Sequence, residues 1–210
     1  MAENKVRSKK IIDVAIELFS QYGYDGVSTT ELSKAVGLSQ PSLHYHYGSK
    51  MGLWKAAIRE LMDRINAEAA LDTDALDKMP PVDALKTMFN PSFFKVQKSF
   101  PELGRLLQLE GVAGGERLSF LVDNYIAGAY GLYLKYIEAG IEQGAIKPYR
   151  PEQILMLMHG ALVNYFNMAN LVELTFKSSP YDDKNAEDYF AMYMDVMFSA
   201  ITVDGGSSKK

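Results

Sequence analysis

A short stretch near the N-terminus concentrates side chains that can contact nucleic acid. The residues assigned to this contact are Thr30, Gln40, Pro41, Ser42, His44, Tyr45 and Lys50. An amide can read the edge of an adenine, and an aromatic ring can contact a thymine methyl group. Hydroxyl, imidazole and ammonium groups suit phosphate oxygens. Gln, His and Tyr are unusual on a merely solvated surface, where Lys and Glu prevail, so the pattern indicates recognition of duplex DNA.

Two short helices with a tight turn between them would position these side chains. Ser28-Thr29-Thr30-Glu31 has the form of a capping box and predicts the start of the first helix. Gly37 ends this helix, because its last turn needs a residue that tolerates a left-handed conformation. Ser39 can cap a second helix over residues 40–47. Together these signals predict a helix-turn-helix, although two capped short helices joined by a Gly turn also occur in many other helical proteins.

The second of these helices has an inward and an outward face. Stepping about 100° per residue from an inward Leu43 turns Pro41 and Tyr45 outward, with Ser42 and His44 beside them. In a helix-turn-helix the second helix lies in the major groove, with its N-terminal residues towards the bases, while the first crosses the backbone. The outward residues are therefore the predicted DNA contacts.

The rest of the sequence shows helical periodicity and no strand pattern. Apolar spacing predicts helices over 9–22, 50–68, 82–89, 102–109, 116–143, 151–176 and 187–201. Residues 71–81, with three Asp and a Pro pair, predict a linker, and Pro91 and Pro101 are expected to interrupt the helices. Residues 204–210 predict a disordered tail. The expected fold class is all-α.

Composition limits the classes of protein to which the chain can belong. The 210 residues are 48% hydrophobic and contain no cysteine, so the chain can bury a core but cannot form a disulfide scaffold. The formal net charge of −4 divides into +2 over residues 1–60 and −6 over the remainder, which leaves DNA binding open for the N-terminal part. Without a signal peptide or an apolar spanning segment, the protein is expected to be soluble and cytoplasmic.

Residues 11–53 resemble the DNA-binding domain of the TetR family of bacterial transcriptional regulators. The match begins with the 11–22 helix and Tyr22-Gly23-Tyr24, and continues through Val27-Ser28-Thr29-Thr30-Glu31-Leu32. It then runs from Ala35-Val36-Gly37-Leu38-Ser39-Gln40-Pro41-Ser42-Leu43-His44-Tyr45-His46-Tyr47 to Gly48-Ser49-Lys50 and Leu53. The family usually has Tyr in place of His44 and often an acidic residue in place of Met51.

The resemblance implies an architecture and a function. It implies a three-helix DNA-binding domain over residues 1–50, followed by a larger helical ligand-binding and dimerisation domain over residues 51–203. A homodimer would bind a pseudo-palindromic operator near its own promoter, usually as a repressor, and a small apolar or amphipathic effector would release the DNA. By position, Thr30, Gln40, Ser42, His44, Tyr45 and Lys50 match family DNA contacts, and Phe19, Leu32, Leu38 and Leu43 match its small core.

The effector pocket must be predicted from residue types, because the C-terminal part of such regulators is variable. A pocket needs apolar walls and a few polar anchors. The candidates are Phe93, Phe94, Leu107, Glu110, Tyr125, Tyr133, His159, Asn164 and Asn167. Aromatic residues at helical spacing are more often core than pocket, and His159 is first read as a buried or interface histidine. The two asparagines need a partner, which can be a ligand, another helix or a second subunit.

Apolar surface in the last two predicted helices, 151–176 and 187–201, exceeds what one monomer covers and predicts a homodimer interface. Effector binding is expected to move the 50–68 helix and so change the distance between the two DNA-reading helices. The alternatives are an all-helical enzyme and a DNA-binding bundle without an effector. The sequence has no nucleophile elbow, P-loop, dinucleotide-binding turn or paired-His metal motif, so we assign no catalytic residue, metal or cofactor and expect no enzyme.

Overall fold

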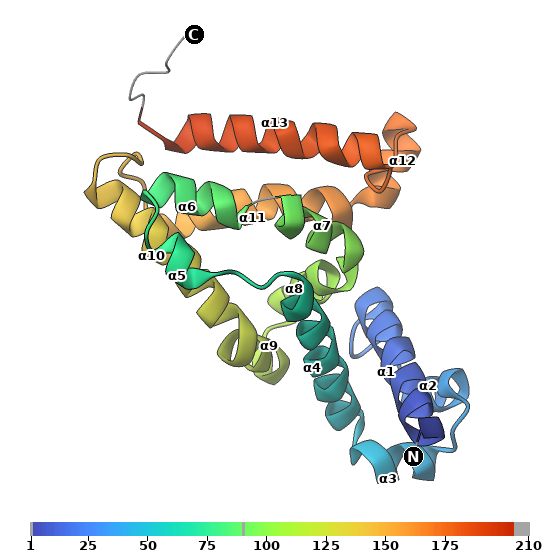
Figure 1. The fold of residues 1–210 in the computed structure, drawn as a ribbon. Helices are drawn as coiled ribbons and strands as arrows, with labels where there is room; N and C mark the ends of the chain where they lie inside the picture. The colour runs from blue at the N-terminus through green and yellow to red at the C-terminus, as the bar shows by residue number, and fades with distance from the viewer. Residues whose placement is uncertain (1, 90, 204–210) are drawn as a thin grey trace. The chain divides into compact units, whose positions relative to one another are not determined.

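The protein is helical nearly throughout, as a computed structural model shows (Figure 1). The structure describes residues 2–89 and 91–203, without the side chains of residues 2–8 and 91–93. The helices are α1 (Ala2–Tyr22), α2 (Thr29–Val36), α3 (Gln40–Tyr47), α4 (Lys50–Glu68), α5 (Thr73–Leu76), α6 (Pro81–Met88), α7 (Pro91–Ser99), α8 (Pro101–Ala113), α9 (Gly115–Leu121), α10 (Ala127–Glu142), α11 (Pro151–Asn167), α12 (Ala169–Phe176) and α13 (Asp183–Ile201). The predicted all-α class is confirmed.

The chain divides into two compact units. The first combines the described residues up to Glu68 with Glu102–Leu121, and the second combines Ala69–Pro101 with the residues from Val122 onward. The first unit therefore holds the predicted helix-turn-helix together with α4, α8 and α9. The functional division between residues 50 and 51 stays a prediction.

The helix-turn-helix of the first unit is built around α1 and α4. In Figure 1, α1 lies beside α4, and α2 and α3 pack against this pair at its lower end. Phe19, Leu32 and Leu53 are among its fully buried side chains, as is Trp54, the only tryptophan in the sequence. This core fixes α3 through Leu43, which is 5% exposed.

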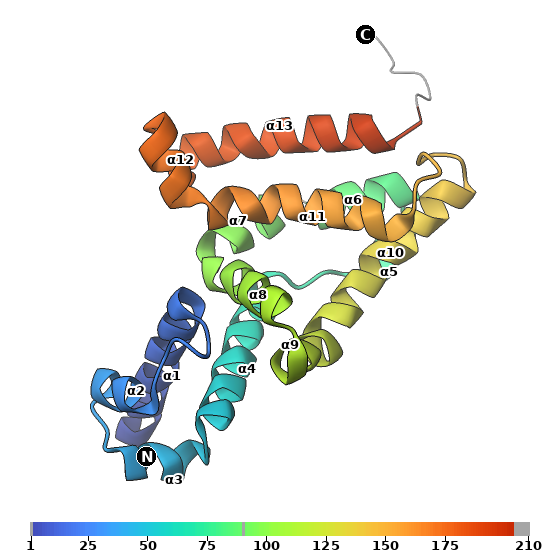
Figure 2. The ribbon, with the colours of Figure 1, turned by 180° about the vertical axis from the view of Figure 1, so that it is seen from behind.

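The second unit is a helical bundle. α10 packs against α6 and α11, and α11 packs in turn against α13, which runs alongside it in Figure 2. The α10–α11 loop passes so close to α10 that a Cβ on Gly140 would lie 2.5 Å from Ile146 Cδ1, which explains why glycine stands there. Backbone hydrogen bonds from Lys147 to Ile201 and from Val203 to Ala145 then tie this loop to the end of α13.

The structure corrects several predicted boundaries. Helix α7 was not predicted; it begins at Pro91, and α8 begins at Pro101, because proline is well tolerated in a first turn. The predicted 151–176 helix is divided at Met168 into α11 and α12. The predicted 116–143 helix contains a π-helical segment, Val122–Ile126, between α9 and α10. The predicted linker over 71–81 contains the single-turn α5. The predicted tail, 204–210, lies outside the described residues.

Within the described residues there is no strand, as predicted, although one isolated bridge is present. Ile146 and Thr202 form an isolated antiparallel bridge within the described residues, which short-range patterns do not reveal. Within the same part of the chain, none of the helices combines the length and apolarity needed to cross a membrane.

Candidate nucleic-acid interface

The first helix of the predicted motif begins with the expected capping box. The Ser28 backbone amide donates to Glu31 Oε2 at 2.7 Å, and the Glu31 amide donates to Ser28 Oγ at 3.1 Å. Hydrogen bonds from the Ser28 backbone and side chain to the Glu31 carboxylate lower the pKa of that carboxyl. The reciprocal bonds satisfy two amides that the start of α2 would otherwise leave without an intrahelical partner.

Replacing Ser28 with alanine is expected to lower the free energy of unfolding by about 1 kcal/mol, because one amide at the start of α2 loses its acceptor. Urea denaturation followed by circular dichroism measures this loss. The matched control is Thr29→Ala, which changes an exposed side chain in the same turn. Equal losses for the two variants would show that the cap does not stabilise the fold.

The turn between α2 and α3 follows from two residues. Gly37 has a φ of +67°, and its amide bonds back to the carbonyls of Lys34 and Ser33. Glycine adopts this left-handed conformation without a Cβ clash. Ser39 then caps α3, since its Oγ accepts from the Ser42 amide at 3.3 Å. Both predicted signals are confirmed.

The exposed face of α3 is the predicted one. Tyr45 is 86% exposed, and Pro41 and His44 are exposed beside it, whereas Leu43 is buried. Ser42 is half-buried because its side chain lies near the cap. α3 therefore offers an aromatic ring and an imidazole to a partner while Leu43 anchors the helix.

Gln40 and Thr30 join the beginnings of the two helices. Gln40 Nε2 donates to Thr30 Oγ1 at 2.5 Å. This contact brings two predicted DNA-binding residues from different helices to one place, and it orients the Gln40 amide relative to the N-terminus of α2. Sequence spacing did not predict the pairing, because it arises from the angle between α2 and α3.

Lys50, the first residue of α4, lies against an aromatic ring. Its Nζ is 4.1 Å from the centroid of Tyr24, and the Arg117 guanidinium is 4.4 Å from the same centroid. Burial lowers the pKa of Lys50, and Asp25 opposes that shift. Tyr24 therefore holds two cations by the attraction of its ring face, and one of them is the predicted phosphate contact.

Arg117 of α9 connects this arrangement to α8. Its Nε donates to Glu110 Oε2 at 2.7 Å and its NH2 group donates to Asp25 Oδ2 at 3.2 Å. The Glu110 side chain is only 2% exposed, so its charge is held by this ion pair. Arg117 is not among the residues predicted from the sequence, because no local pattern links it to residues so far away in the chain.

The structure distributes the predicted effector residues between the two units. Glu110 and the half-buried Leu107 lie in the first unit. In the second, Phe94 and Tyr133 are buried, Tyr125, His159 and Asn167 are half-buried and Asn164 is exposed. The side chain of Phe93 lies outside the described set.

Tyr130 brings two of these residues together. Its hydroxyl and His159 Nδ1 are hydrogen-bonded at 3.3 Å, and its hydroxyl interacts electrostatically with that of Tyr133. Tyr130 is not among the residues predicted from the sequence, although its position three residues before Tyr133 places both on one face of a helix. That spacing was the signal that could have identified it.

Burial lowers the pKa of His159 below the value of about 6.5 expected for an unfolded chain. The unfolded state therefore binds a proton below that pH before the folded state does, so the free energy of unfolding should fall as pH drops from about 7 to 5. Replacing His159 with glutamine should flatten this slope. Urea denaturation across the range measures it.

The control for this pH dependence is His46→Gln, since His46 is exposed. It should retain the slope of the original chain. The carboxyls with lowered pKa, such as Glu31 and Asp77, titrate below this window and do not obscure it. If the free energy of unfolding of His159→Gln still falls with pH as in the original chain, His159 does not cause this pH dependence.

Comparisons with known proteins agree with the geometry. The model described as "Bacterial regulatory proteins, tetR family" matches residues 11–57, and that described as "Tetracyclin repressor-like, C-terminal domain" matches residues 81–197. The second match alone spans more than half of the sequence. The chain belongs to the TetR family of DNA-binding transcriptional regulators, which confirms the predicted resemblance.

Individual relatives are distant over their full length. The chain is 23% identical to the HTH-type transcriptional regulator RutR of Escherichia coli strain K12 over 167 residues, which cover 80% of this chain and 77% of RutR. It is 40% identical over 57 residues to IcaR of Staphylococcus aureus strain Newman, a negative regulator of a biofilm operon; these cover 27% of this chain and 31% of IcaR. Both relatives are regulators, not enzymes.

A solved structure shares the fold. AibR, determined in complex with isovaleryl coenzyme A and operator DNA, has a TM-score of 0.70 at 18% identity. The similarity covers 91% of this chain and 98% of AibR. At this level of identity the comparison establishes the fold alone.

Proposed function

We propose that this protein is a ligand-responsive repressor that binds a pseudo-palindromic operator as a homodimer and leaves it when a small apolar or amphipathic effector binds. The observation that carries the DNA-binding part is the exposed Tyr45 on α3, a helix that Leu43 and the Ser39 cap hold in place. Its ring is 86% exposed and is therefore available to contact a base in the major groove.

Each proposed contact has a role in this interface. The Tyr45 ring contacts a thymine methyl group, and the Gln40 amide reads a base edge at the start of α3. Thr30 and Lys50 stand in the first turns of α2 and α4, where helix N-termini favour phosphate. Pro41, Ser42 and His44 complete the face that meets the DNA.

Gel shifts with DNA flanking the gene, measured over a series of salt concentrations, test this proposal. Specific binding should persist against competitor DNA and weaken as salt rises, because phosphate contacts release counterions. Titration should give two chains per operator. Equal affinity for random duplexes would refute the proposal of operator recognition.

The homodimer is proposed to form through α11 and α13. Met156 and Leu157 on α11 and Met192 and Val196 on α13 are each more than half exposed. Apolar surface of this extent typically marks an interface, and two half-sites on one face of DNA, about 34 Å apart, call for two copies of α3. Repression is favoured over activation because IcaR is a negative regulator.

Effector binding is proposed to move α4, which ends at the last residue of the first unit before the chain enters the second. The movement would change the distance between the two copies of α3. Because the chain has no cysteine, His46→Cys gives each copy one spin label. The label-to-label distance should differ between the DNA-bound protein and the protein with a stabilising ligand found by thermal screening; identical distances would exclude this coupling.

A further inference from the structure

A cluster of aromatic hydroxyls lies inside the second unit. Tyr130 and Tyr133 come from α10, His159 from α11 and Tyr193 from α13, and Phe89 follows the end of α6. The Phe89 ring centroid is 4.9 Å from that of Tyr133 and 6.0 Å from that of Tyr193. The Phe89 ring therefore lies close to side chains of α10 and α13, and we call these five residues the Phe89 cluster.

One polar atom of this cluster is unsatisfied. Tyr193 is 2% exposed, and its hydroxyl has no hydrogen-bond partner among the described residues. A buried hydroxyl in this state costs stability, because it has left water without gaining a bond. Tyr189 shows how a tyrosine hydroxyl in this unit can be satisfied, since it donates to the Ala161 carbonyl at 2.6 Å.

No charged side chain among the described residues is buried in the second unit. Among the described residues, the buried polar or charged side chains are Ser20, Ser33 and Glu110, all in the first unit. Burial raises the pKa of Tyr193, with smaller contributions only from Tyr133 and Tyr189. Burial alone lowers the pKa of His159. An ion placed here would therefore lose its hydration without gaining a counter-charge.

We propose that the Phe89 cluster is the effector site, and that its ligand is an uncharged molecule with an aromatic ring and a carbonyl oxygen that accepts a hydrogen bond from the Tyr193 hydroxyl. This inference rests on the proposed function, because it assigns the place and chemistry of the effector. The ligand ring packs against Phe89 and Tyr133, and the Tyr130–His159 pair forms the polar edge of the site.

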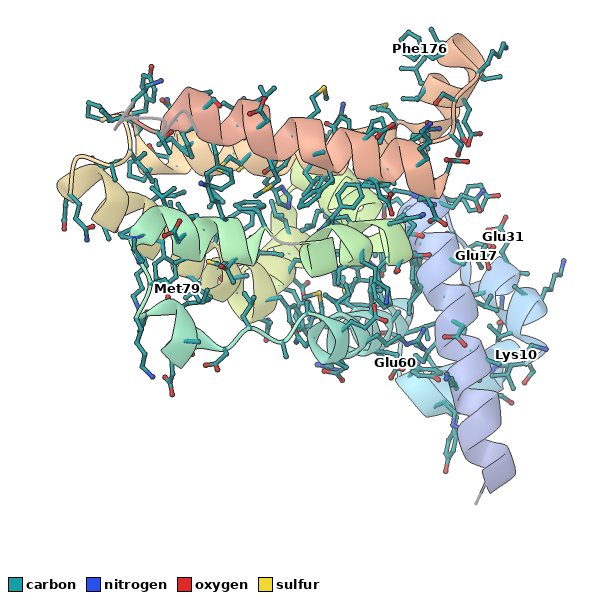
Figure 3. The ribbon with its side chains drawn as sticks, turned by 45° about the horizontal axis from the view of Figure 1, so that its top comes forward. Lys10, Glu17, Glu31, Glu60, Met79 and Phe176 are labelled. Atoms are coloured by element: carbon teal, nitrogen blue, oxygen red, sulfur yellow. The ribbon has the colours of Figure 1, made fainter. Side chains whose placement is uncertain are left out.

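The position of Phe89 suits this role. It is the C-cap of α6, whereas Tyr133 and Tyr193 lie within longer helices. Its ring is therefore the part of the cluster that can turn aside for a ligand with the least disturbance to a helix. Phe176, by comparison, lies at the end of α12 and points away from the bundle (Figure 3).

Three single-ring probes test the chemistry: acetophenone, cumene and benzoate. All three contain one benzene ring. Acetophenone carries a ketone carbonyl, cumene carries a hydrocarbon group of similar shape, and benzoate carries a negative charge. Isothermal calorimetry on the full chain without DNA should show acetophenone binding roughly tenfold more tightly than cumene, because only the ketone satisfies Tyr193. Benzoate should bind most weakly. Equal binding of acetophenone and cumene, or no binding of either, would overturn the proposal.

Tyr193→Phe tests the residue. This variant removes the unpaired hydroxyl, so it should fold and should lose the tenfold preference while binding cumene unchanged. Tyr189→Phe is the matched control, because its hydroxyl is already bonded to the backbone, and it should keep the preference. A preference that survives in Tyr193→Phe would overturn the assignment. These measurements need no DNA, so failure of operator binding and failure of this site are distinguishable.

Discussion

Replacing Arg117 with leucine is expected to lower the free energy of unfolding by about 3 kcal/mol, because the substitution leaves the Glu110 carboxylate buried without its partner. The Glu110 side chain is 2% exposed and accepts from Arg117 at 2.7 Å. The cost lies at the lower end of the range for buried pairs, since Arg117 keeps 16% of its side-chain surface in solvent. The variant also loses the contact with the Tyr24 ring. Thermal and urea denaturation followed by circular dichroism measure the loss.

Two further variants separate the buried charge from other effects of the substitution. Combining Glu110→Leu with Arg117→Leu should recover much of the stability, because no unpaired charge remains. Lys55→Ala breaks the ion pair with Glu116, whose side chain is 71% exposed, and should change stability only slightly. If Arg117→Leu lowers the free energy of unfolding no more than Lys55→Ala does, the burial of Glu110 does not make its ion pair with Arg117 more stabilising than an exposed pair.

Replacing Tyr45 with alanine is expected to weaken operator binding by about 1–3 kcal/mol, or roughly 5- to 150-fold, if the ring contacts a base as proposed. Because Tyr45 is 86% exposed, the variant should keep the stability of the original chain. Fluorescence anisotropy with labelled operator DNA measures the affinity. Binding to random DNA should change much less, since phosphate contacts remain.

Controls identify which part of the tyrosine acts. Tyr45→Phe keeps the ring, so near-normal affinity would indicate contact with a thymine methyl group, whereas a loss of affinity would indicate a hydrogen bond from the hydroxyl to the DNA. Tyr149→Ala removes another exposed tyrosine, which lies outside the first unit, and should leave the affinity unchanged. Unaltered operator binding by Tyr45→Ala would exclude Tyr45 as a contact.

The local parts of the fold were predictable because their signals lie close together in the sequence. The capping box, Gly37 and Ser39 each act over three or four residues, and together they gave α2, the turn and α3 with the observed boundaries. The exposed face of α3 was predicted from helical periodicity, with Leu43 placed on the buried side. The same reasoning missed α7, because a proline that marks the end of one helix can equally begin another.

The contacts that depend on packing were not predictable from these signals. Arg117 meets Asp25 across 92 positions of sequence, and only the folded arrangement of α9 and the α1–α2 loop brings them together. Tyr193 has no distinguishing pattern around it, and its unsatisfied hydroxyl is visible only when its neighbours in space are known. Glu110 illustrates the same point, since its ion pair with Arg117 is visible only in the folded arrangement.

The buried Trp54 gives the chain an optical reporter of its own. It lies 5.8 Å from the ring centroid of Phe120 and 6.5 Å from that of Tyr24, all within the first unit. Because it is the only tryptophan in the sequence, any fluorescence excited selectively in tryptophan comes from the DNA-binding part of the molecule. Emission from that single indole can therefore follow how α4 and α9 respond to DNA or a ligand, without a label and without a signal from the tyrosine-rich second unit.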